Sequence, residues 1–405
     1  MVPARQKLLD AIRARPEDDD LRLVYADALE EAGDVEQAEF IRTGIAIAQD
    51  RATPAEKARA TELESLHGER FVGPVVAEHA EGWSFRRGLV DTIRSVPPCT
   101  LADHADEILG WAPIHTLVLG DAEDDPYDGG WEQWPDHTLA AARRLAACPH
   151  LAHLVTLDMS QGALGDQNDE GARLRLLLES PHLKRLETIL IGSECSTAAA
   201  IAIAEAHERL PALRVLRFGA PLGNGRVGDA GARAIAASPL CARLEVLEIL
   251  ASDVTREGFE PLAGSFRSLR ELHLGGTWYV QNPIGAAGAI ALAESTGVSN
   301  LETLDLGGAG VGDDGAIAIA SAPWLASVRY LDLSDNDLTD RSALAIARSP
   351  FAKSLEHLAL AYGAVHPVRT NAISDAAIAT LFASIPSLDD VRVGADGGTR
   401  LPRPR

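Results

Sequence analysis

The chain has 405 residues, 46% of them apolar and 24% charged, a composition typical of a folded protein with a sizeable core and not of a disordered chain. Its 37 basic and 59 acidic residues give a net charge of −22, which would repel nucleic acid and an anionic membrane surface. Four scattered cysteines, no signal-like apolar run at the start and no stretch near about 18 apolar residues predict a cytoplasmic protein with reduced thiols.

Helical spacing of apolar residues predicts a small all-α domain over residues 1–84. Helices are expected at residues 7–15, between the acidic run 17–20 and Gly33, around Phe40 to Ile45, and from Pro54 to His67. The second of these carries an apolar face at three- and four-residue steps. The face consists of Leu21, Val24, Tyr25, Ala28 and Leu29.

The segment LLDAIRARPEDDDLRLVYADALEEAGDVEQAEFIR at 8–42 resembles the bacterial repeat-companion domain that precedes leucine-rich repeats. The segments LHGERFVGP at 66–74 and GWSFRRGLVDTI at 82–93 resemble the stretch that joins this domain to the first repeat. The resemblance implies a cytoplasmic interaction role and brings no catalytic residues with it. Such domains often have an aromatic residue after the YAD triplet, where this chain has Ala28.

From Leu154 onward one phrase recurs nine times: an apolar residue, two variable ones, an apolar, a variable and an apolar. Its openings are Leu154, Leu186, Leu213, Leu244, Leu269, Leu301, Val328, Leu355 and Leu388. The spacings of 25 to 33 residues indicate stacked units, and the phrase is similar to the leucine-rich repeat signature. Residues 90–96 and 114–119 are expected to be earlier strands. The sequence therefore predicts an α/β solenoid over 85–405, of about ten to eleven repeats, with a curved parallel sheet inside and helices outside.

A recognisable helix start follows several of these phrases and resembles the ribonuclease-inhibitor-like class of repeats. The segments are VGDAGARAIA from 227, IGAAGAIALA from 284, VGDDGAIAIA from 311 and ISDAAIATLF from 373. Gly228, Gly312 and Ser374 are expected to be N-cap residues, as are Thr255 and Thr339. The acidic residues Asp229, Asp313 and Asp375 would then lie at the positive ends of the helix dipoles.

Two further features concern how the array closes its turns and its ends. The asparagine usual three residues past the third apolar position occurs once, as Asn336, so an asparagine ladder is expected to be largely absent. The helical domain is expected to cap the first repeat, because an uncapped solenoid exposes apolar side chains. The tail GGTRLPRPR at 397–405 is expected to contribute little capping.

Variable residues beside the central apolar of each phrase should form two columns on the concave face, because strand side chains alternate between faces. One column is Val118, Asp158, Leu190, Arg217, Glu248, His273, Asp305, Asp332, Ala359 and Arg392, and the other includes Val246, Glu271, Thr303, Tyr330 and His357. Glu248, Glu271, Asp305 and Asp332 form the predicted acidic patch, with His273 and Tyr330 beside it. The patch suits a basic segment of a protein partner. The alternative is a solvated face without a ligand.

Two loops are longer and more aromatic than the repeat requires. One runs from Asp121 to Asp136 and the other from Gly275 to Asn282. Their aromatic residues are Tyr127, Trp131, Trp134, Trp278 and Tyr279. Exposed aromatic side chains are unfavourable unless they pack or bind, so Trp131, Trp134, Trp278 and Tyr279 are predicted to contact a partner at the loop edge. Packing back onto the array is the alternative.

No motif indicates catalysis, a cofactor or a metal. His150 and His153 have a spacing that could ligate a metal, but no carboxylate or cysteine completes the set, which favours surface histidines. Gly223, Gly225 and Gly228 form a dinucleotide-type pattern, yet Asp229 would lie where a pyrophosphate needs a positive helix end. No serine or cysteine nucleophile has a recognisable setting.

The sequence is most consistent with a non-enzymatic scaffold that binds a protein partner through the concave face and the loop edge. The alternative hypothesis is a regulator, activator-like, of a nucleotide-hydrolysing enzyme. That hypothesis comes from the likeness of fold to GTPase activators built on similar repeats. Neither hypothesis requires a cofactor, a metal, nucleic acid or a membrane.

Overall fold

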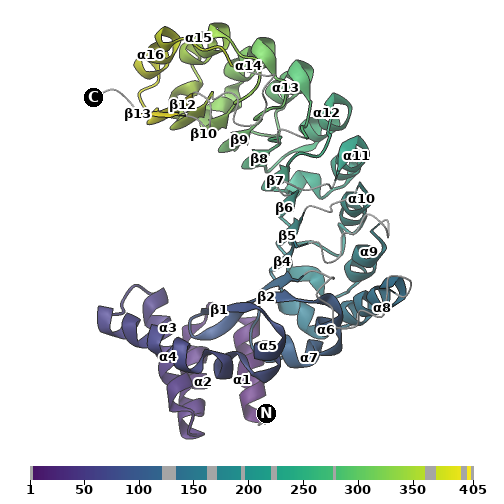
Figure 1. Cartoon of the computed structure of the whole chain (residues 1–405), viewed down its shortest axis with the longest axis vertical. Helices are drawn as coiled ribbons and strands as arrows, with labels where there is room; N and C mark the ends of the chain where they lie inside the picture. The colour runs from purple at the N-terminus through teal and green to yellow at the C-terminus, as the bar shows by residue number, and fades with distance from the viewer. Residues whose placement is uncertain are drawn as a thin grey trace. The chain divides into compact units, whose positions relative to one another are not determined.

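The computed structural model describes residues 3–120, 134–161, 171–192, 197–219, 226–276, 280–360, 371–393 and 399–402. The chain divides into two compact units. The first unit comprises Met1–Leu164, Leu176–Glu187 and Arg209–Ala212, and the second unit comprises Gly165–Arg175, Thr188–Glu208 and Leu213–Arg405. Helices and strands of both units are labelled in Figure 1.

The first unit begins with five helices and continues with strands that alternate with further helices. The helices are α1 (Pro3–Ala14), α2 (Asp19–Glu31), α3 (Val35–Ala48), α4 (Pro54–Val72), α5 (Pro74–His79), α6 (Pro98–Asp103), α7 (Ala105–Ile108) and α8 (Trp134–Ala146), with 3-10 turns η2 (Pro149–His153) and η4 (Leu183–Arg185). The strands are β1 (Gly82–Arg86), β2 (Leu89–Val96), β3 (Thr116–Leu119) and β4 (Thr156–Met159). Helix α4 starts with a capping box between Thr53 and Glu56 and continues past the predicted end at His67.

The apolar face of α2 differs from its prediction at two positions. Tyr25 and Leu29 are buried, with Leu9 and Ile12 of α1, in one apolar cluster. Val24, expected on the same face, is 51% exposed, whereas Arg22 is buried. A three-residue step, such as that from Leu21 to Val24, and a four-residue step both fit a helix. Periodicity therefore could not show which of two adjacent rows of side chains is buried.

Helix α3 packs directly on the turn between β1 and β2. Gly44 and Gly88 allow the close approach, because a Cβ on Gly44 would lie 2.4 Å from the backbone nitrogen of Gly88. Gly88 also has φ +75, which favours glycine. Phe40, Phe71 and Phe85 fill the space beside this contact with their rings 5.0 to 6.5 Å apart. The helices and the first strands therefore share a core.

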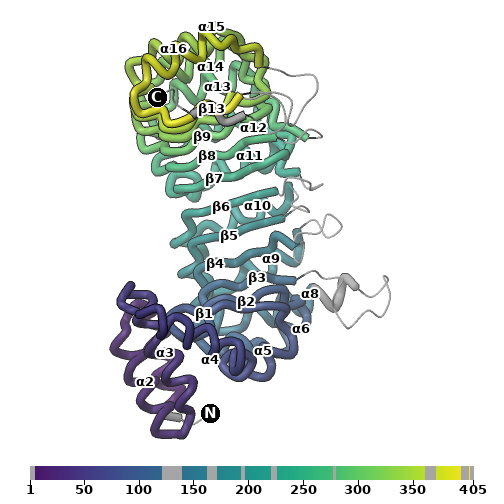
Figure 2. Tube along the Cα trace, turned by 60° about the vertical axis from the view of Figure 1, so that its left-hand side comes forward, coloured from purple at the N-terminus to yellow at the C-terminus, as the bar shows by residue number. Residues whose placement is uncertain are grey.

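The second unit is built of parallel strands. They are β5 (Thr188–Ile191), β6 (Val215–Phe218), β7 (Val246–Ile249), β8 (Glu271–His273), β9 (Thr303–Asp305), β10 (Tyr330–Asp332), β11 (His357–Ala359) and β12 (Asp390–Val393), and β13 (Thr399–Pro402) runs antiparallel to β12. Strand order follows chain order from β5 to β13, and Figure 2 shows these strands stacked one on the next. The central residues Leu216, Leu247, Leu272, Leu304, Leu331 and Leu358 are fully buried.

One helix per repeat lies behind this sheet, on the side opposite the concave face (Figure 1). The helices are α10 (Thr197–Glu205), α11 (Gly228–Ala237), α12 (Arg256–Ser265), α13 (Gly285–Glu294), α14 (Gly312–Ser321), α15 (Asp340–Arg348) and α16 (Asp375–Ser384). The 3-10 turns η5 (Cys241–Arg243), η6 (Pro323–Ser327) and η7 (Ala352–Ser354) lead into strands, and α9 (Ala172–Leu178) has residues in both units. The predicted α/β leucine-rich repeat solenoid, preceded by a helical N-terminal part, is confirmed.

The helix starts follow two rules and not one. Thr255, Thr339 and Ser374 are N-cap residues whose side chains accept from the backbone, as predicted. Gly228 and Gly312 are instead the first helical residues, so their prediction as N-caps is wrong. The aspartates that follow them reach the next repeat. Asp229 accepts from Thr255 N and Oγ at 2.7 Å, and Asp313 accepts from Thr339 N at 2.9 Å and Oγ at 2.6 Å.

Buried asparagines form part of a ladder, contrary to the expectation. Asn336 donates to Leu306 O at 2.8 Å and accepts from Val311 N at 2.9 Å. Asn282 and Asn371 make equivalent hydrogen bonds in other repeats. Asn282 Oδ1 accepts from Ser252 N and Val254 N, and Asn371 Oδ1 accepts from Asn336 N and Leu338 N. Both follow long loops, which displace them in the sequence but not in space.

The first and last strands of the sheet are both antiparallel to their neighbours. In the first unit β1 pairs with β2, and in the second unit β13 pairs with β12. The tail, expected to contribute little, thus supplies β13, which covers the backbone edge of β12. Because an uncovered edge exposes backbone donors and acceptors, this strand finishes the second unit.

Candidate partner-binding face

The two predicted columns lie in strand register on the concave face of the second unit. Residues at the position before the third apolar align as Arg217, Glu248, His273, Asp305, Asp332, Ala359 and Arg392. The companion column aligns as Val215, Val246, Glu271, Thr303, Tyr330, His357 and Asp390. The structure therefore brings together the four carboxylates of the predicted acidic patch and places His273 and Tyr330 among them.

One arginine pairs with both carboxylates in the first half of the acidic patch. Arg217 Nη1 donates to the Glu248 carboxylate, and Arg217 Nη2 lies 3.6 Å from Glu271 Oε2. Arg217 stands in the same column as Glu248, so its position was visible in the sequence, but its pairing with two columns was not. Because one positive charge serves two carboxylates, part of the negative charge remains at Glu248 and Glu271, and Asp305 and Asp332 add to it further along the array.

His273 lies between the two halves. Its Nε2 is 3.5 Å from Glu271 Oε2, and its Nδ1 is 3.9 Å from Asp305 Oδ2. The nearby Asp305 carboxylate raises the pKa of His273, against the opposing effect of burial. His273 therefore adds positive charge to the patch as the pH falls, which gives the face a pH-dependent charge.

Asp305 and Asp332 stand side by side on adjacent strands. Each uses one oxygen to accept a backbone N–H two residues later: Gly307 N at 2.9 Å and Ser334 N at 2.8 Å. Burial, and next the charge of Asp305, raise the pKa of Asp332 to about 6, although Ser334 and Arg392 act in the opposite direction. The surroundings of Asp332 therefore disfavour its ionised form. A cation placed nearby would stabilise that form.

Tyr330 and its neighbours border this pair. The Tyr330 hydroxyl lies 3.5 Å from Asp332 Oδ2, and burial raises the pKa of Tyr330 to about 12. Its ring centroid is 6.3 Å from that of His357, whose Nδ1 lies 3.1 Å from Asp390 Oδ2. Asp390 is buried and was not among the predicted site residues. Its place in the companion column is the signal that could have found it.

The predicted aromatic contacts are largely outside the described residues. Trp131, Trp278 and Tyr279 lie there, and Trp134 is described only as the first residue of α8.

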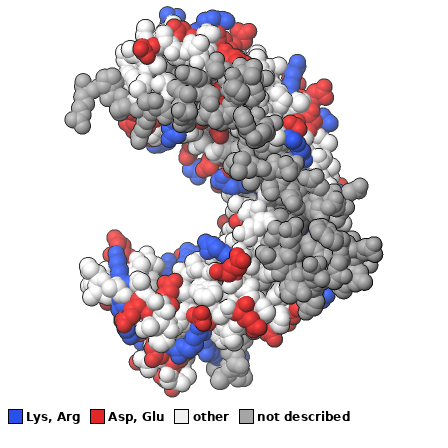
Figure 3. All heavy atoms as spheres, viewed as in Figure 1, with Lys and Arg blue, Asp and Glu red and all other residues white. Residues whose placement is uncertain are grey.

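Acidic and basic side chains are interspersed over the described part of the face shown in Figure 3. The net charge of the chain is thus not gathered into one acidic field there, which makes local arrangements such as Asp305 with Asp332 more informative than the total.

The histidines and cysteines considered as candidate metal ligands or nucleophiles lie in surroundings that do not favour those roles. His150 and His153 are both partly exposed, and burial lowers the pKa of His153 to about 4. Within the described ranges, no three histidine, cysteine or acidic residues are grouped to hold a metal ion. Burial raises the pKa of the Cys241 thiol to about 12. Of the helices in the described part of the chain, none has the length and apolarity to span a bilayer.

Parallel strands on one side, helices on the other and a recurring apolar triplet define a leucine-rich repeat solenoid. Residues 299–320 and 325–347 match the family described as Leucine Rich repeat, and they contain β9 and β10 and all but the last residue of α14 and of α15. No curated protein matches the chain. The crystal structure of a protein from Bacteroides fragilis is similar at 14% identity over 86% of this chain and 85% of that one, with a TM-score of 0.37.

Proposed function

We propose that this protein is a non-enzymatic cytoplasmic scaffold that binds a protein partner through the concave face of its second unit and the adjoining loop edge. Leucine-rich repeats generally mediate contacts between proteins. The helix that accompanies each repeat supports assignment to the ribonuclease-inhibitor-like class. Residues 1–84 act in this proposal as a repeat-companion domain that closes the start of the solenoid at 85–405.

The partner carries a basic segment. The observation that supports this is the pair Asp305 and Asp332, adjacent in register, with the ionised form of Asp332 disfavoured by burial and by its neighbour. A lysine or arginine side chain placed between the two carboxylates would be attracted by both and would lower the pKa of Asp332. Binding of a basic side chain would therefore offset the unfavourable ionisation of Asp332 in the unbound face.

The surrounding residues would give the contact its shape. Tyr330 offers an aromatic wall beside the pair, as tyrosines do at the centres of many interfaces. Glu248 and Glu271, already bridged by Arg217, with His273 would form a polar rim. Trp131, Trp134, Trp278 and Tyr279 would extend the contact along the loop edge.

The experiment that tests this measures binding of arginine- and lysine-containing peptides to the full chain by calorimetry at low and high salt. Asp305→Asn with Asp332→Asn removes the paired charges and keeps their size. Its matched control is Glu257→Gln with Glu294→Gln, the same charge change at exposed positions on α12 and α13. We expect the concave-face variant to lose affinity about tenfold and the control variant to change it less than twofold.

A selective loss that shrinks as salt rises supports the proposed contact, because screening weakens exposed ion pairs. Equal losses in both variants would mean that only the net charge matters. That result would remove the acidic pair from the site. Peptides whose lysines are acetylated serve as the neutral comparison.

A further inference from the structure

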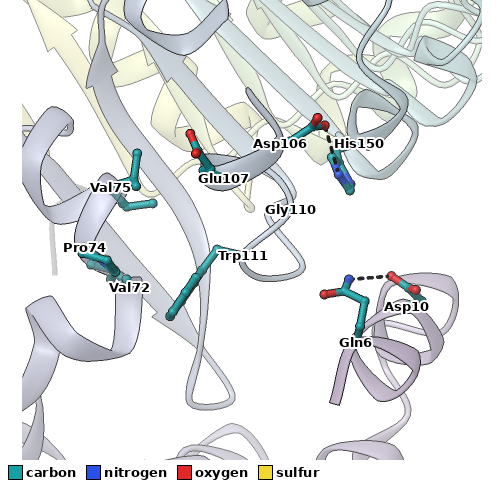
Figure 4. Close-up of a pocket in the computed structure, with 12 residues that line it drawn as sticks. Gln6, Asp10, Val72, Pro74, Val75, Asp106, Glu107, Gly110, Trp111 and His150 are labelled. Atoms are coloured by element: carbon teal, nitrogen blue, oxygen red, sulfur yellow. Dashed lines mark hydrogen bonds and ion pairs between the residues drawn. The ribbon is translucent and has the colours of Figure 1, made fainter. Parts of the chain in front are cut away.

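A cavity of about 610 Å³ opens in the first unit, apart from the concave face, and falls within the range of about 300 to 1,000 Å³ typical of small-molecule sites. Four segments far apart in the sequence line it. Gln6 and Asp10 come from α1, and residues 72–76 come from the junction of α4 and α5. Asp106, Glu107, Gly110 and Trp111 come from α7 and the loop after it, and His150 comes from η2. Figure 4 shows these side chains around the opening.

One wall of the cavity is apolar and rigid. It is formed by the Trp111 indole with Val72, Pro74 and Val75 (Figure 4). Trp111 Nε1 donates to Phe71 O at 3.1 Å, which fixes the ring. A Cβ on Gly73, whose φ is +90, would lie 2.6 Å from the ring, so the backbone and the indole meet as closely as glycine permits. The wall therefore presents an aromatic face held by a hydrogen bond and by close packing on the backbone.

Carboxylates line other parts of the rim. Asp106 and Glu107 are 84% and 60% exposed, and their described partners are His150 at 3.5 Å and His104 at 2.7 Å. Burial and then the charge of Arg13 lower the pKa of His150, so His150 leaves the charge of Asp106 in place at neutral pH. Asp10 is paired with Arg13 at 2.7 Å. Asp106 and Glu107 thus give the rim an excess of negative charge.

We propose that this cavity binds an organic cation, an ammonium or guanidinium group carried on an apolar body. The body would lie against Trp111 and the valines, and the cation would face Asp106 and Glu107. An indole face and carboxylates are the two surfaces that favour such a ligand, the first through its quadrupole and the second through charge. The ligand is either a free amine or a basic side chain of a peptide. The site shares no residue with the concave face, so it does not depend on the function proposed above.

The test uses the full chain labelled with 5-fluorotryptophan, whose six fluorine signals include Trp111, assigned with Trp111→Phe. Phenethylamine is the probe, and 2-phenylethanol and 3-phenylpropionate are its neutral and anionic counterparts. We expect phenethylamine to shift the Trp111 signal saturably and the two counterparts to bind at least about tenfold more weakly. A capped peptide containing lysine next to tryptophan is the second cationic probe. Tighter binding of this peptide identifies a peptide side chain as the source, and tighter binding of phenethylamine identifies a free amine.

Two charge variants separate the rim from the net charge. Asp106→Asn with Glu107→Gln is expected to weaken phenethylamine binding about tenfold. Glu31→Gln with Glu69→Gln makes the same charge change at exposed positions of the first unit and is expected to leave binding unchanged. An absent shift, equal binding of the neutral counterpart, or equal losses in both variants would overturn the proposal. Because the probe comparison uses the unaltered chain, a folding defect in a variant cannot hide the answer.

Discussion

The two units join their segments with different kinds of hydrogen bond. In the first unit Arg13 is fully buried and donates to Gly110 O at 2.6 Å and Ala112 O at 3.3 Å, a contact made once. In the second unit the contact from an aspartate to the next helix start recurs, from Asp229 to Thr255 and from Asp313 to Thr339. A repeated contact tolerates the loss of one copy, whereas a single contact does not. The first unit should therefore be the more sensitive to substitution.

The largest effect should come from the single contact. Arg13→Met keeps most of the side-chain volume but leaves two buried carbonyl groups without this donor, and we expect a loss of about 3 to 4 kcal/mol in the free energy of unfolding. Urea unfolding of the full chain, followed by circular dichroism, measures it. The control is Arg15→Met, whose side chain is 64% exposed, with an expected change below about 0.5 kcal/mol. Similar values for both variants would contradict the comparison.

A smaller effect should follow from removing one member of the recurring set. Asn336→Ala removes the acceptor of Val311 N and one of the donors to Leu306 O, both backbone groups of one turn, at an expected cost of about 2 to 3 kcal/mol. Hydrogen exchange should speed up at Val311 and in the adjacent turn while α10 and α11 keep their protection. The exposed Asn300→Ala is the control. Loss of protection throughout the second unit would show that its repeats are not locally independent.

The smallest effect should be a stabilisation and not a loss of stability. It concerns Asp332, a side chain of the second unit that does not belong to the recurring contacts. The pKa of Asp332, raised to about 6, means that its ionised form opposes folding. This contribution is present above that pH and disappears as the pH falls toward the ordinary aspartate value. Asp332→Asn should therefore stabilise the protein by about 2 kcal/mol at pH 7.5 and by little at pH 4. Thermal unfolding at both pH values measures it, and a destabilised variant at pH 7.5 would contradict the assignment.

The strands were the most predictable part of the molecule. Each apolar triplet from Leu154 to Leu388 lies in or beside a strand, because a buried central residue tolerates little but leucine, isoleucine or valine. The same pattern placed the columns of the concave face, since alternation along a strand decides which side a residue takes. The identity of the pairs across strands was less accessible, as the link of Arg217 to both Glu248 and Glu271 shows.

Loops account for most of the errors. Asn282 and Asn371 fill the asparagine position from the far ends of long loops, so a fixed offset from the strand could not find them. Gly228 and Gly312 were assigned as caps because glycine occurs there, whereas the helix begins with them. In α2, Val24 and Arg22 exchange the places expected from polarity alone. Arg22 is buried together with its guanidinium, which donates to Asp18 O at 3.4 Å, so a polar residue can take a place that periodicity gives to an apolar one.

The antiparallel strands β1 and β13 bear on how such a chain can change length. A parallel repeat added beyond either strand would lie next to a strand of the opposite direction and could not form the parallel hydrogen-bond pattern with it. Duplication or deletion of repeats is therefore compatible with the architecture in the interior, between two fixed terminators. A row of repeats whose strand phrases are spaced by 25 to 33 residues offers many equivalent points for such an exchange, which would lengthen the concave face without changing its ends.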